Sequence, residues 1–376
     1  MDDSLDIVGI FGTGRNGSTL LLRLLDGIPG TYVHPEEVNF LSAFDDFACY
    51  GHIRKETSFY AKVRPLMHLN RSLSADVLVP HYQSQVDQIH NEYLSQIEGP
   101  HSIETRPDVL SDIESSGELG SEEFIQAFLA AFSNWISGKS RPAVFKSLEV
   151  PYIEDYTHLF PRMKCIHIIR NPVDVYASLI RATREKENPV RMPSWYLAGD
   201  NLTTVVQKRW LPHARFLAGK PDPTRHKVIR YEDLVVDPLN RIQDVCSWLS
   251  WPMPDRPEHL TVLGGHTSRR LPKNVGKVGA ETPSQVVRDT SEHFHYDDAV
   301  TDAERDMIRL LTYPLARQLG YWEDEPPPAK ERVLRAWLTP KQWEFRHSRS
   351  LMGGIRSVLS AIQRRFVLFR EVARAS

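Results

Sequence analysis

The 376-residue chain has an ordinary globular composition, with 41% hydrophobic residues, 25% charged residues and a formal net charge of -2. This length can bury a large core, as one large domain or two ordinary ones. The near-neutral charge excludes a broadly basic surface, so we expect no nucleic-acid partner. Acidic residues follow Met1 and no apolar run approaches membrane-spanning length, so we expect a cytoplasmic protein.

The cysteines and histidines show no spacing typical of metal ligands. Cysteines occur at three distant positions, Cys49, Cys165 and Cys246. Their odd number and the absence of a CxxC pattern predict reduced thiols, with neither a disulfide framework nor a structural zinc site. The histidines that we regard as bystanders on the same ground are His213, His226, His259 and His266.

Short apolar runs alternate with helical patterns along most of the chain. The runs predicted as strands are 5–11, 143–147, 164–169 and 226–230. They contain no proline and suit burial on both faces of a parallel sheet. Helices are predicted at 18–27, 151–158, 172–186, 238–250 and 301–319. This alternation predicts an α/β fold, a three-layer α/β/α domain with a central parallel sheet.

The domain organisation is predicted from one long insertion and one proline-rich segment. Residues 40–138, between the first two predicted strands, have mostly helical periodicity and are expected to form a cap on the ligand side of the sheet. Three successive prolines make 323–331 a stiff linker. The linker separates a domain over 1–322 from a tail over 332–376.

The C-terminal tail is basic. From residue 330 to residue 376 the chain has 11 Lys and Arg against 3 Asp and Glu. Apolar residues at helical spacing alternate with arginines in IRSVLSAIQRRFVLF, which makes this segment a candidate for contact with an anionic membrane or a partner. The simpler interpretation is a helix packed on the protein's own core, and we assign no function to the tail.

A glycine-rich loop lies between the first predicted strand and helix. The stretch IVGIFGTGRNGSTLLLRLLDG, residues 7–27, carries Gly12, Gly14 and Gly17 and matches the GxGxxG pattern. The backbone N–H groups of such a loop, with the amino end of the next helix, bind an anion. Three glycines, an arginine and two hydroxyls at one helix start therefore predict a phosphate-binding loop.

Two kinds of nucleotide loop fit this stretch in part. For a dinucleotide fold, Glu36 and Glu37 stand near the position of an acidic ribose ligand, but 31–40 is a poor buried second strand because Pro35 and two carboxylates lie at its centre. For a nucleotide P-loop, the Gly-x4-Gly-Ser-Thr spacing fits, but the lysine expected before the hydroxyl is missing.

A second motif follows a later predicted strand. In CIHIIRNPVDVYASLIRATRE, residues 165–185, Arg170 ends the strand and Ser178 lies eight residues further on. Pro172 suits the first turn of a helix, and eight residues make about two turns, so both side chains can contact one phosphate.

Together the two motifs resemble those of the sulfotransferase superfamily. There, the first loop binds the 5′-phosphosulfate of 3′-phosphoadenosine-5′-phosphosulfate (PAPS), and the arginine and serine of the second motif bind its 3′-phosphate. The resemblance covers roughly residues 5–320 and implies a P-loop-NTPase-like sulfotransferase fold with a helical cap. The donor contacts that it implies are Gly12, Thr13, Gly14, Arg15, Asn16, Gly17, Ser18, Thr19, Arg170 and Ser178.

Two further segments are similar to the family. RYEDLVVDP, 230–238, resembles the segment whose tyrosine contacts the adenine, which implies that role for Tyr231. SRRLPKNVGKVG, 268–279, resembles the late loop over the 3′-phosphate, most closely that of tyrosylprotein sulfotransferases. The contacts implied there are Ser268, Arg269, Arg270 and Lys273.

The expected chemistry needs cations and a base. Sulfuryl transfer, like phosphoryl transfer, should depend on positioning and charge stabilisation, so no metal is obligatory. Lys146 stands at about the spacing of the catalytic lysine of cytosolic sulfotransferases, and with Arg15 it is expected to neutralise the leaving phosphate. Those enzymes have a histidine base two residues later, where this chain has Leu148. The base must therefore come from elsewhere.

The candidate bases lie in HPEEVNFL, residues 34–41. The resemblance to tyrosylprotein and several bacterial sulfotransferases implies a carboxylate just past the first helix, and Glu36 lies 21 residues after Arg15. Glu37 is the neighbouring candidate. The extended backbone after proline aims successive side chains in different directions, so we expect only one of the pair to point at the acceptor hydroxyl, and we favour Glu36. His34 is a third candidate.

The sequence thus favours a PAPS-dependent O-sulfotransferase that acts on a hydroxyl of a small molecule, a sugar or a tyrosine. Two alternatives stay open. One is a P-loop kinase of a small alcohol, which would need Mg²⁺ and ATP. The other is a non-catalytic nucleotide-binding module. The sequence predicts neither the identity of the acceptor nor the oligomeric state.

Overall fold

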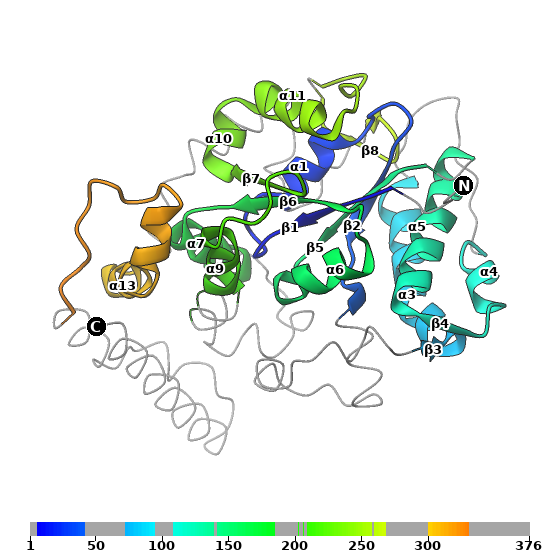
Figure 1. Cartoon of the computed structure of the whole chain (residues 1–376), viewed down its shortest axis with the longest axis horizontal. Coiled ribbons are helices and arrows are strands. Elements are labelled where there is room, and N and C mark those ends of the chain that lie inside the picture. Colours follow the sequence, from blue (N-terminus) through cyan, green and yellow to red (C-terminus); the bar gives the residue numbers. More distant parts are fainter. Residues whose placement is uncertain are drawn as a thin grey trace, which may run out of the picture. The chain divides into compact units, whose positions relative to one another are not determined.

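A computed structural model describes residues 6–41, 72–94, 108–138, 141–184, 202, 206, 209–257, 259–267 and 300–330 (Figure 1). The described residues of 1–12, 17–168 and 222–292 form one compact unit, the sheet unit. Those of 13–16, 169–221 and 293–376 form a second, the helical unit. The predictions for the late loop at 268–279 and for the tail at 332–376 lie outside the described residues.

The sheet unit is built on five strands. They are β1 (Ile7–Phe11), β2 (Tyr32–Glu37), β5 (Ala143–Ser147), β6 (Lys164–Ile169) and β7 (His226–Arg230). Their order in the sheet is β2-β5-β1-β6-β7, and β1 pairs in parallel with both β5 and β6. Every residue of β1 and β5 is buried, as expected for central strands covered on both faces. The predicted α/β fold with a central parallel sheet is confirmed.

Strand β2 corrects the sequence-based expectation for residues 31–40. We expected a poor strand there, but Tyr32–Glu37 pairs in parallel with β5. Because β2 lies at the edge of the sheet, the missing N–H of Pro35 leaves no neighbouring strand without a donor. The register shifts between Val33 and Glu37, and the two glutamates at the end of the strand are only half-buried. The first four residues of β2 are thus buried, and its two glutamates are partly exposed.

Helices cover both faces of this sheet. In Figure 1, α1 (Ser18–Leu25) and α11 (Pro238–Leu249) lie on one face, whereas α6 (Ile153–Leu159) lies on the other. A short 3-10 turn, Val150–Tyr152, precedes α6, and α10 (Tyr231–Val236) precedes α11. These helices confirm the three predicted at 18–27, 151–158 and 238–250, with small differences at their ends.

The described part of the predicted cap is mostly helical. It comprises α3 (Ala75–Glu92), α4 (Ser111–Glu114), α5 (Ser121–Ser137) and a short hairpin of β3 (Ser72–Ser74) with β4 (Glu118–Gly120). Phe124, Phe128 and Phe132 recur at four-residue spacing along α5, and their rings pack on one another and on Phe40 and His34. This aromatic contact attaches α5 to the β2 side of the sheet unit. That the cap also encloses a ligand stays a prediction.

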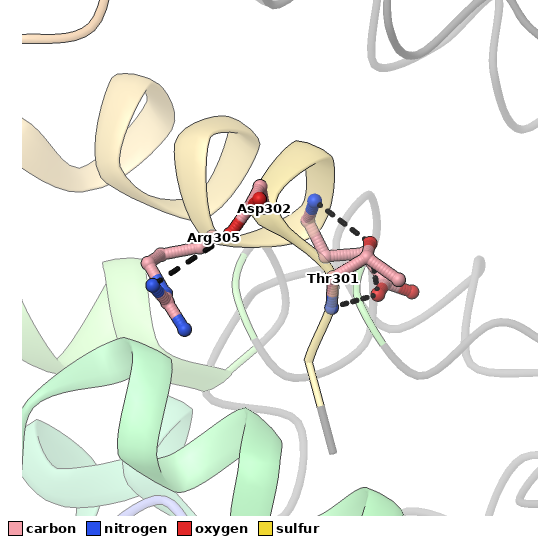
Figure 2. A network of polar contacts seen from close by, with 4 residues as sticks. Thr301, Asp302 and Arg305 are labelled. Atoms are coloured by element: carbon pink, nitrogen blue, oxygen red, sulfur yellow. Dashed lines mark hydrogen bonds and ion pairs between the residues drawn. The ribbon is translucent and has the colours of Figure 1, made fainter. Parts of the chain in front are cut away.

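The helical unit contains α7 (Pro172–Arg184), α9 (Leu211–Ala218) and α13 (Asp302–Gln318), which share a buried core that includes Trp210 and Met307. Thr301 is the N-cap of α13 (Figure 2). The Thr301 side chain accepts a hydrogen bond from the Glu304 N–H, and the Glu304 carboxylate accepts one from the Thr301 N–H. This capping box satisfies backbone donors at the helix start. The Tyr176 hydroxyl of α7 also donates to Glu304, over 3.1 Å, and so joins α7 to α13.

Two observations bear on the expectations from composition. Cys165 and Cys246 are buried free thiols, as predicted for reduced cysteines. Among the described helices, none has the length and apolarity required to span a bilayer.

Candidate active site

The predicted phosphate loop, Gly12–Thr19, connects β1 to α1. Gly14, Arg15 and Gly17 all have positive φ, at 68°, 58° and 93°, so the loop is a tight succession of left-handed turns. Gly17 is the N-cap of α1 and supplies no capping side chain to the first helical N–H groups. The amino end of α1 therefore presents its backbone donors and its positive dipole end at the loop, as an anion site requires.

Tyr231 lies directly against this loop. A Cβ atom placed on Gly17 would lie 2.2 Å from Cδ2 of the Tyr231 ring, which is closer than real Cβ atoms approach. The tyrosine is the first residue of α10 and is buried. Glycine is thus needed at position 17 for two reasons, its left-handed backbone and the close approach of an aromatic ring. The predicted adenine contact lies beside the predicted phosphate loop.

Lys146 connects strand β5 to the start of α1. Its ammonium donates a hydrogen bond of 3.0 Å to Thr19 Oγ1, and the lysine is 7% exposed. Burial lowers the pKa of Lys146 below its ordinary value, while the charges of Glu37 and Glu36 act in the opposite direction. Glu37 is also the pairing partner of Lys146 between β2 and β5. One cluster in the sheet unit therefore holds the predicted lysine, a loop hydroxyl and both candidate carboxylates.

The two carboxylates have different partners. Tyr93, just after α3, donates its hydroxyl hydrogen bond to Glu36. The Arg23 guanidinium lies 4.9 Å from the centre of the Tyr93 ring and donates to the Pro35 carbonyl over 3.2 Å. Glu36 is thus positioned from two helices, α1 and α3.

Glu37 is oriented from the loop after β2. Its carboxylate accepts a hydrogen bond of 3.1 Å from the Asn39 amide. The other end of that amide, the Asn39 oxygen, accepts from the Ser147 hydroxyl and from the Leu148 N–H. Asn39 thereby ties Glu37 to the end of β5, so the two neighbouring glutamates are held by separate parts of the fold.

The third candidate base, His34, is a core residue. Its side chain is 0% exposed, and its two ring nitrogens are hydrogen-bonded to the Tyr32 hydroxyl and to the Gln85 side chain. Burial lowers the pKa of His34 to about 3, so the ring is neutral at physiological pH. Pro35 does not interrupt β2, so His34 lies within the strand and its ring packs against Phe128 and Phe132 of α5.

Within the helical unit, the second motif contacts residue 15 of the loop. Arg15 Nε donates to Ser178 Oγ over 3.2 Å, and Arg170 Nη1 donates to the Arg15 carbonyl over 3.2 Å. Trp210 Nε1 in turn donates to the Arg170 carbonyl over 2.9 Å. Arg170 and Ser178 are 5% and 7% exposed. The two motifs that the sequence singled out therefore meet at Arg15.

Several of these contacts carried no sequence signal. Tyr93 stood within an ordinary helical pattern, and Arg23 looked like a basic residue on the first helix. Asn39 lies in the same HPEEVNFL stretch as the glutamates, so its polar side chain beside them was the one available hint. The Thr13 hydroxyl is buried and has no hydrogen-bond partner among the described residues, which suits it to an anion at the loop.

Fold and site together define an α/β protein with a glycine-rich loop between its central strand β1 and the helix α1. A model of the Sulfotransferase family matches residues 8–255, which is more than half of the chain. The chain belongs to the sulfotransferase family.

One more distant relative is also named as a sulfotransferase. A 3-alpha-hydroxysteroid sulfotransferase from Cavia porcellus is 25% identical over 150 residues, which cover 37% of this chain and 48% of that protein. The chain thus matches about half the length of this relative.

Solved structures of similar proteins include sulfotransferase domains from the curacin biosynthetic pathway and from the Synechococcus PCC 7002 olefin synthase. The first is 19% identical with a TM-score of 0.47 and covers 84% of this chain and 98% of that one. The second is 19% identical with a TM-score of 0.49 and covers 87% and 98%.

Proposed function

We propose that the protein transfers a sulfuryl group from PAPS to an acceptor hydroxyl. The observation that carries the proposal is the contact of Arg15 with both Ser178 and Arg170, because it joins a phosphate loop to a second cationic anion site. PAPS carries phosphate groups at its 5′ and 3′ positions, so it needs two such sites.

The loop binds the 5′-phosphosulfate in this proposal. Backbone N–H groups from Gly12 to Thr19, with the hydroxyls of Thr13, Ser18 and Thr19, donate to the phosphate oxygens. Arg170 and Ser178 bind the 3′-phosphate, and Arg15 donates a hydrogen bond to Ser178. Tyr231 contacts the adenine. The further contacts proposed for the 3′-phosphate are Ser268, Arg269, Arg270 and Lys273, outside the described residues.

Glu36 acts as the general base. It accepts the proton of the acceptor hydroxyl while the acceptor oxygen bonds to sulfur and the bond from sulfur to the bridging phosphate oxygen breaks. Lys146 and Arg15 stabilise the negative charge that develops on that leaving oxygen. Because Lys146 is almost fully buried, its charge acts through a low-dielectric surrounding and is more effective than in water. Glu37 is the alternative base.

A transfer assay tests the proposal. The full chain is incubated with radiolabelled PAPS and EDTA, and with a panel of acceptors that contains a phenol, a tyrosine peptide, a sugar and a hydroxysteroid. The hydroxysteroid is included because the guinea-pig relative carries that acceptor class in its name. Glu36→Gln is compared with Glu154→Gln, an exposed glutamate on α6. We expect label on at least one acceptor and a loss only in Glu36→Gln.

The same assay separates the two alternatives. In a parallel reaction with labelled ATP and Mg²⁺ and without EDTA, a P-loop kinase would label an acceptor, and it would transfer none from PAPS. A non-catalytic module would bind adenosine 3′,5′-bisphosphate without labelling any acceptor. Either result would overturn the proposed reaction.

A further inference from the structure

A cluster of soft and borderline metal ligands lies on the sheet, apart from the residues proposed for transfer. Cys165 and His167 occupy alternate positions of β6, so their side chains lie on the same face. His226 begins the neighbouring strand, β7. The ligand atoms of the three side chains all lie within 4.8 Å of one another. We propose that Cys165, His167 and His226 form a binding site for a zinc ion.

The distances in the cluster are close to those of a zinc site. His167 Nε2 and His226 Nδ1 are 2.9 Å apart, and the rings are stacked with centroids 5.2 Å apart. With Zn–N bonds of about 2.0–2.1 Å, tetrahedral zinc separates two nitrogen ligands by roughly 3.3–3.4 Å. The two nitrogens need to part by only about half an ångström to admit the ion. His226 is the half-buried member of the pair, so its ring is the one expected to move.

The cluster is buried on one side and can be reached from solvent on the other. Cys165 and His167 are fully buried, and the Phe11 ring is stacked on the His167 ring with centroids 6.0 Å apart. His226 is half-buried and leaves a route from solvent. Three protein ligands from the inner side and a water molecule from the His226 side complete four-coordinate zinc.

The three ligand atoms indicate which kind of metal the cluster would bind. One thiolate and two imidazoles suit a borderline ion such as Zn²⁺, whereas Mg²⁺ and Ca²⁺ prefer oxygen ligands. On binding, the Cys165 thiol releases its proton, and the thiolate offsets half of the charge of the ion. The Arg225 guanidinium lies near the cluster, and its positive charge opposes the binding of a dication. The guanidinium donates hydrogen bonds to the carbonyls of Thr157 and Phe160, over 2.9 and 3.1 Å.

Sequence spacing did not indicate this site. Known short patterns place ligands a few residues apart around a turn, whereas here two ligands share a strand face and the third lies 59 residues further on. Only the pairing of β6 with β7 brings His226 to the other two. The site is separate from the proposed transfer reaction, which needs no metal, and bound zinc would tie the edge strand β7 to β6.

Metal titration of the whole chain tests the proposal. The EDTA-treated and dialysed protein is titrated with Zn²⁺ by calorimetry, and with Co²⁺ while its absorption spectrum is recorded. We expect one ion per chain, a thiolate-to-cobalt charge-transfer band, and a higher melting temperature with Zn²⁺. Cys165→Ser should abolish the band, and His226→Ala should weaken Zn²⁺ binding at least about tenfold.

Two controls keep the test decisive. Cys246→Ser removes another buried thiol, on α11, outside the cluster, and should leave the band and the affinity unchanged. His226→Ala changes a half-buried side chain and provides the answer if Cys165→Ser does not fold. A chain that binds no Zn²⁺, or that keeps its affinity and its band in His226→Ala, would overturn the proposal, whatever the outcome for sulfuryl transfer.

Discussion

Arg15 and Ser178 lie 163 positions apart in the sequence and are joined by a hydrogen bond of 3.2 Å from the guanidinium to the hydroxyl. Arg170 donates to the carbonyl of the same arginine. Residues 13–16 of the glycine-rich loop and the second motif at the start of α7 thus meet at one cation. In the proposed function, this arrangement lowers the entropic cost of binding a donor with two phosphate groups.

Replacement of the proposed base should separate chemistry from binding. Glu36→Gln keeps the shape of the side chain and its contact with Tyr93 but cannot accept the proton, so we expect turnover to fall by about 10²–10⁴-fold. Calorimetry should give nearly unchanged affinity for adenosine 3′,5′-bisphosphate. Glu37→Gln is the matched comparison. If Glu37→Gln were the slower variant, the roles of the two glutamates would be reversed.

The hydroxyl of Tyr93 should position the base. Tyr93→Phe keeps the ring under Arg23 and removes the donor to Glu36, so the carboxylate loses a contact that orients it. We therefore expect kcat to fall by about tenfold while the affinity for adenosine 3′,5′-bisphosphate stays unchanged. Tyr152→Phe, at the turn before α6, is the control. An unchanged kcat in Tyr93→Phe would show that Tyr93 only packs.

The charge of Lys146 should set the alkaline limb. Burial lowers the pKa of Lys146 below 10.5, and the ammonium is lost as the pH rises through that lowered value. Activity should therefore decline at a lower pH than for an ordinary lysine. Glu37→Gln removes a negative charge that raises this pKa, so the alkaline limb should move to still lower pH. A pH–rate profile of the two proteins measures this, and movement to higher pH would contradict the assignment.

Gly17 should be more sensitive than glycines with a similar backbone. Gly30→Ala also places a Cβ at positive φ, of 78°, but its Cβ meets nothing within 4 Å, so only the left-handed strain of about 1–2 kcal/mol applies. Gly17→Ala carries the same strain and must in addition displace the Tyr231 ring. We expect a larger loss of unfolding free energy in urea, with weakened nucleotide binding. Equal losses in both variants would contradict the close contact with Tyr231.

Local sequence patterns were sufficient to predict most of the fold. The central strands are unbroken apolar runs, and the helices after them begin with capping or proline signals such as Pro172 and Asp237-Pro238. Strand β2 was missed because Pro35 and two glutamates look unlike a buried strand. Only the order of the sheet, with β2 at an edge, explains why they are tolerated.

The site was predictable in its motifs but not in its contacts. Glycines before a helix and an arginine at a strand end are local signals, and the structure brings them together at Arg15. The contacts of Tyr93 and Asn39 with the glutamates depend on how the cap and the end of β5 pack, which no local pattern encodes. The burial of His34 has the same origin, since the α5 aromatic residues that cover it, Phe128 and Phe132, lie 94 and 98 positions away.

Nucleotide binding to Arg170→Ala tests the central claim most directly. Calorimetry compares adenosine 3′,5′-bisphosphate with 5′-AMP on the wild-type chain, on Arg170→Ala and on Arg162→Ala, an exposed arginine used as the control. We predict that the wild type prefers the bisphosphate and that Arg170→Ala loses about 1.5–3 kcal/mol of its binding, roughly 10- to 150-fold, with little change for 5′-AMP. Unchanged affinity for the bisphosphate in Arg170→Ala would contradict the claim that this arginine binds a 3′-phosphate.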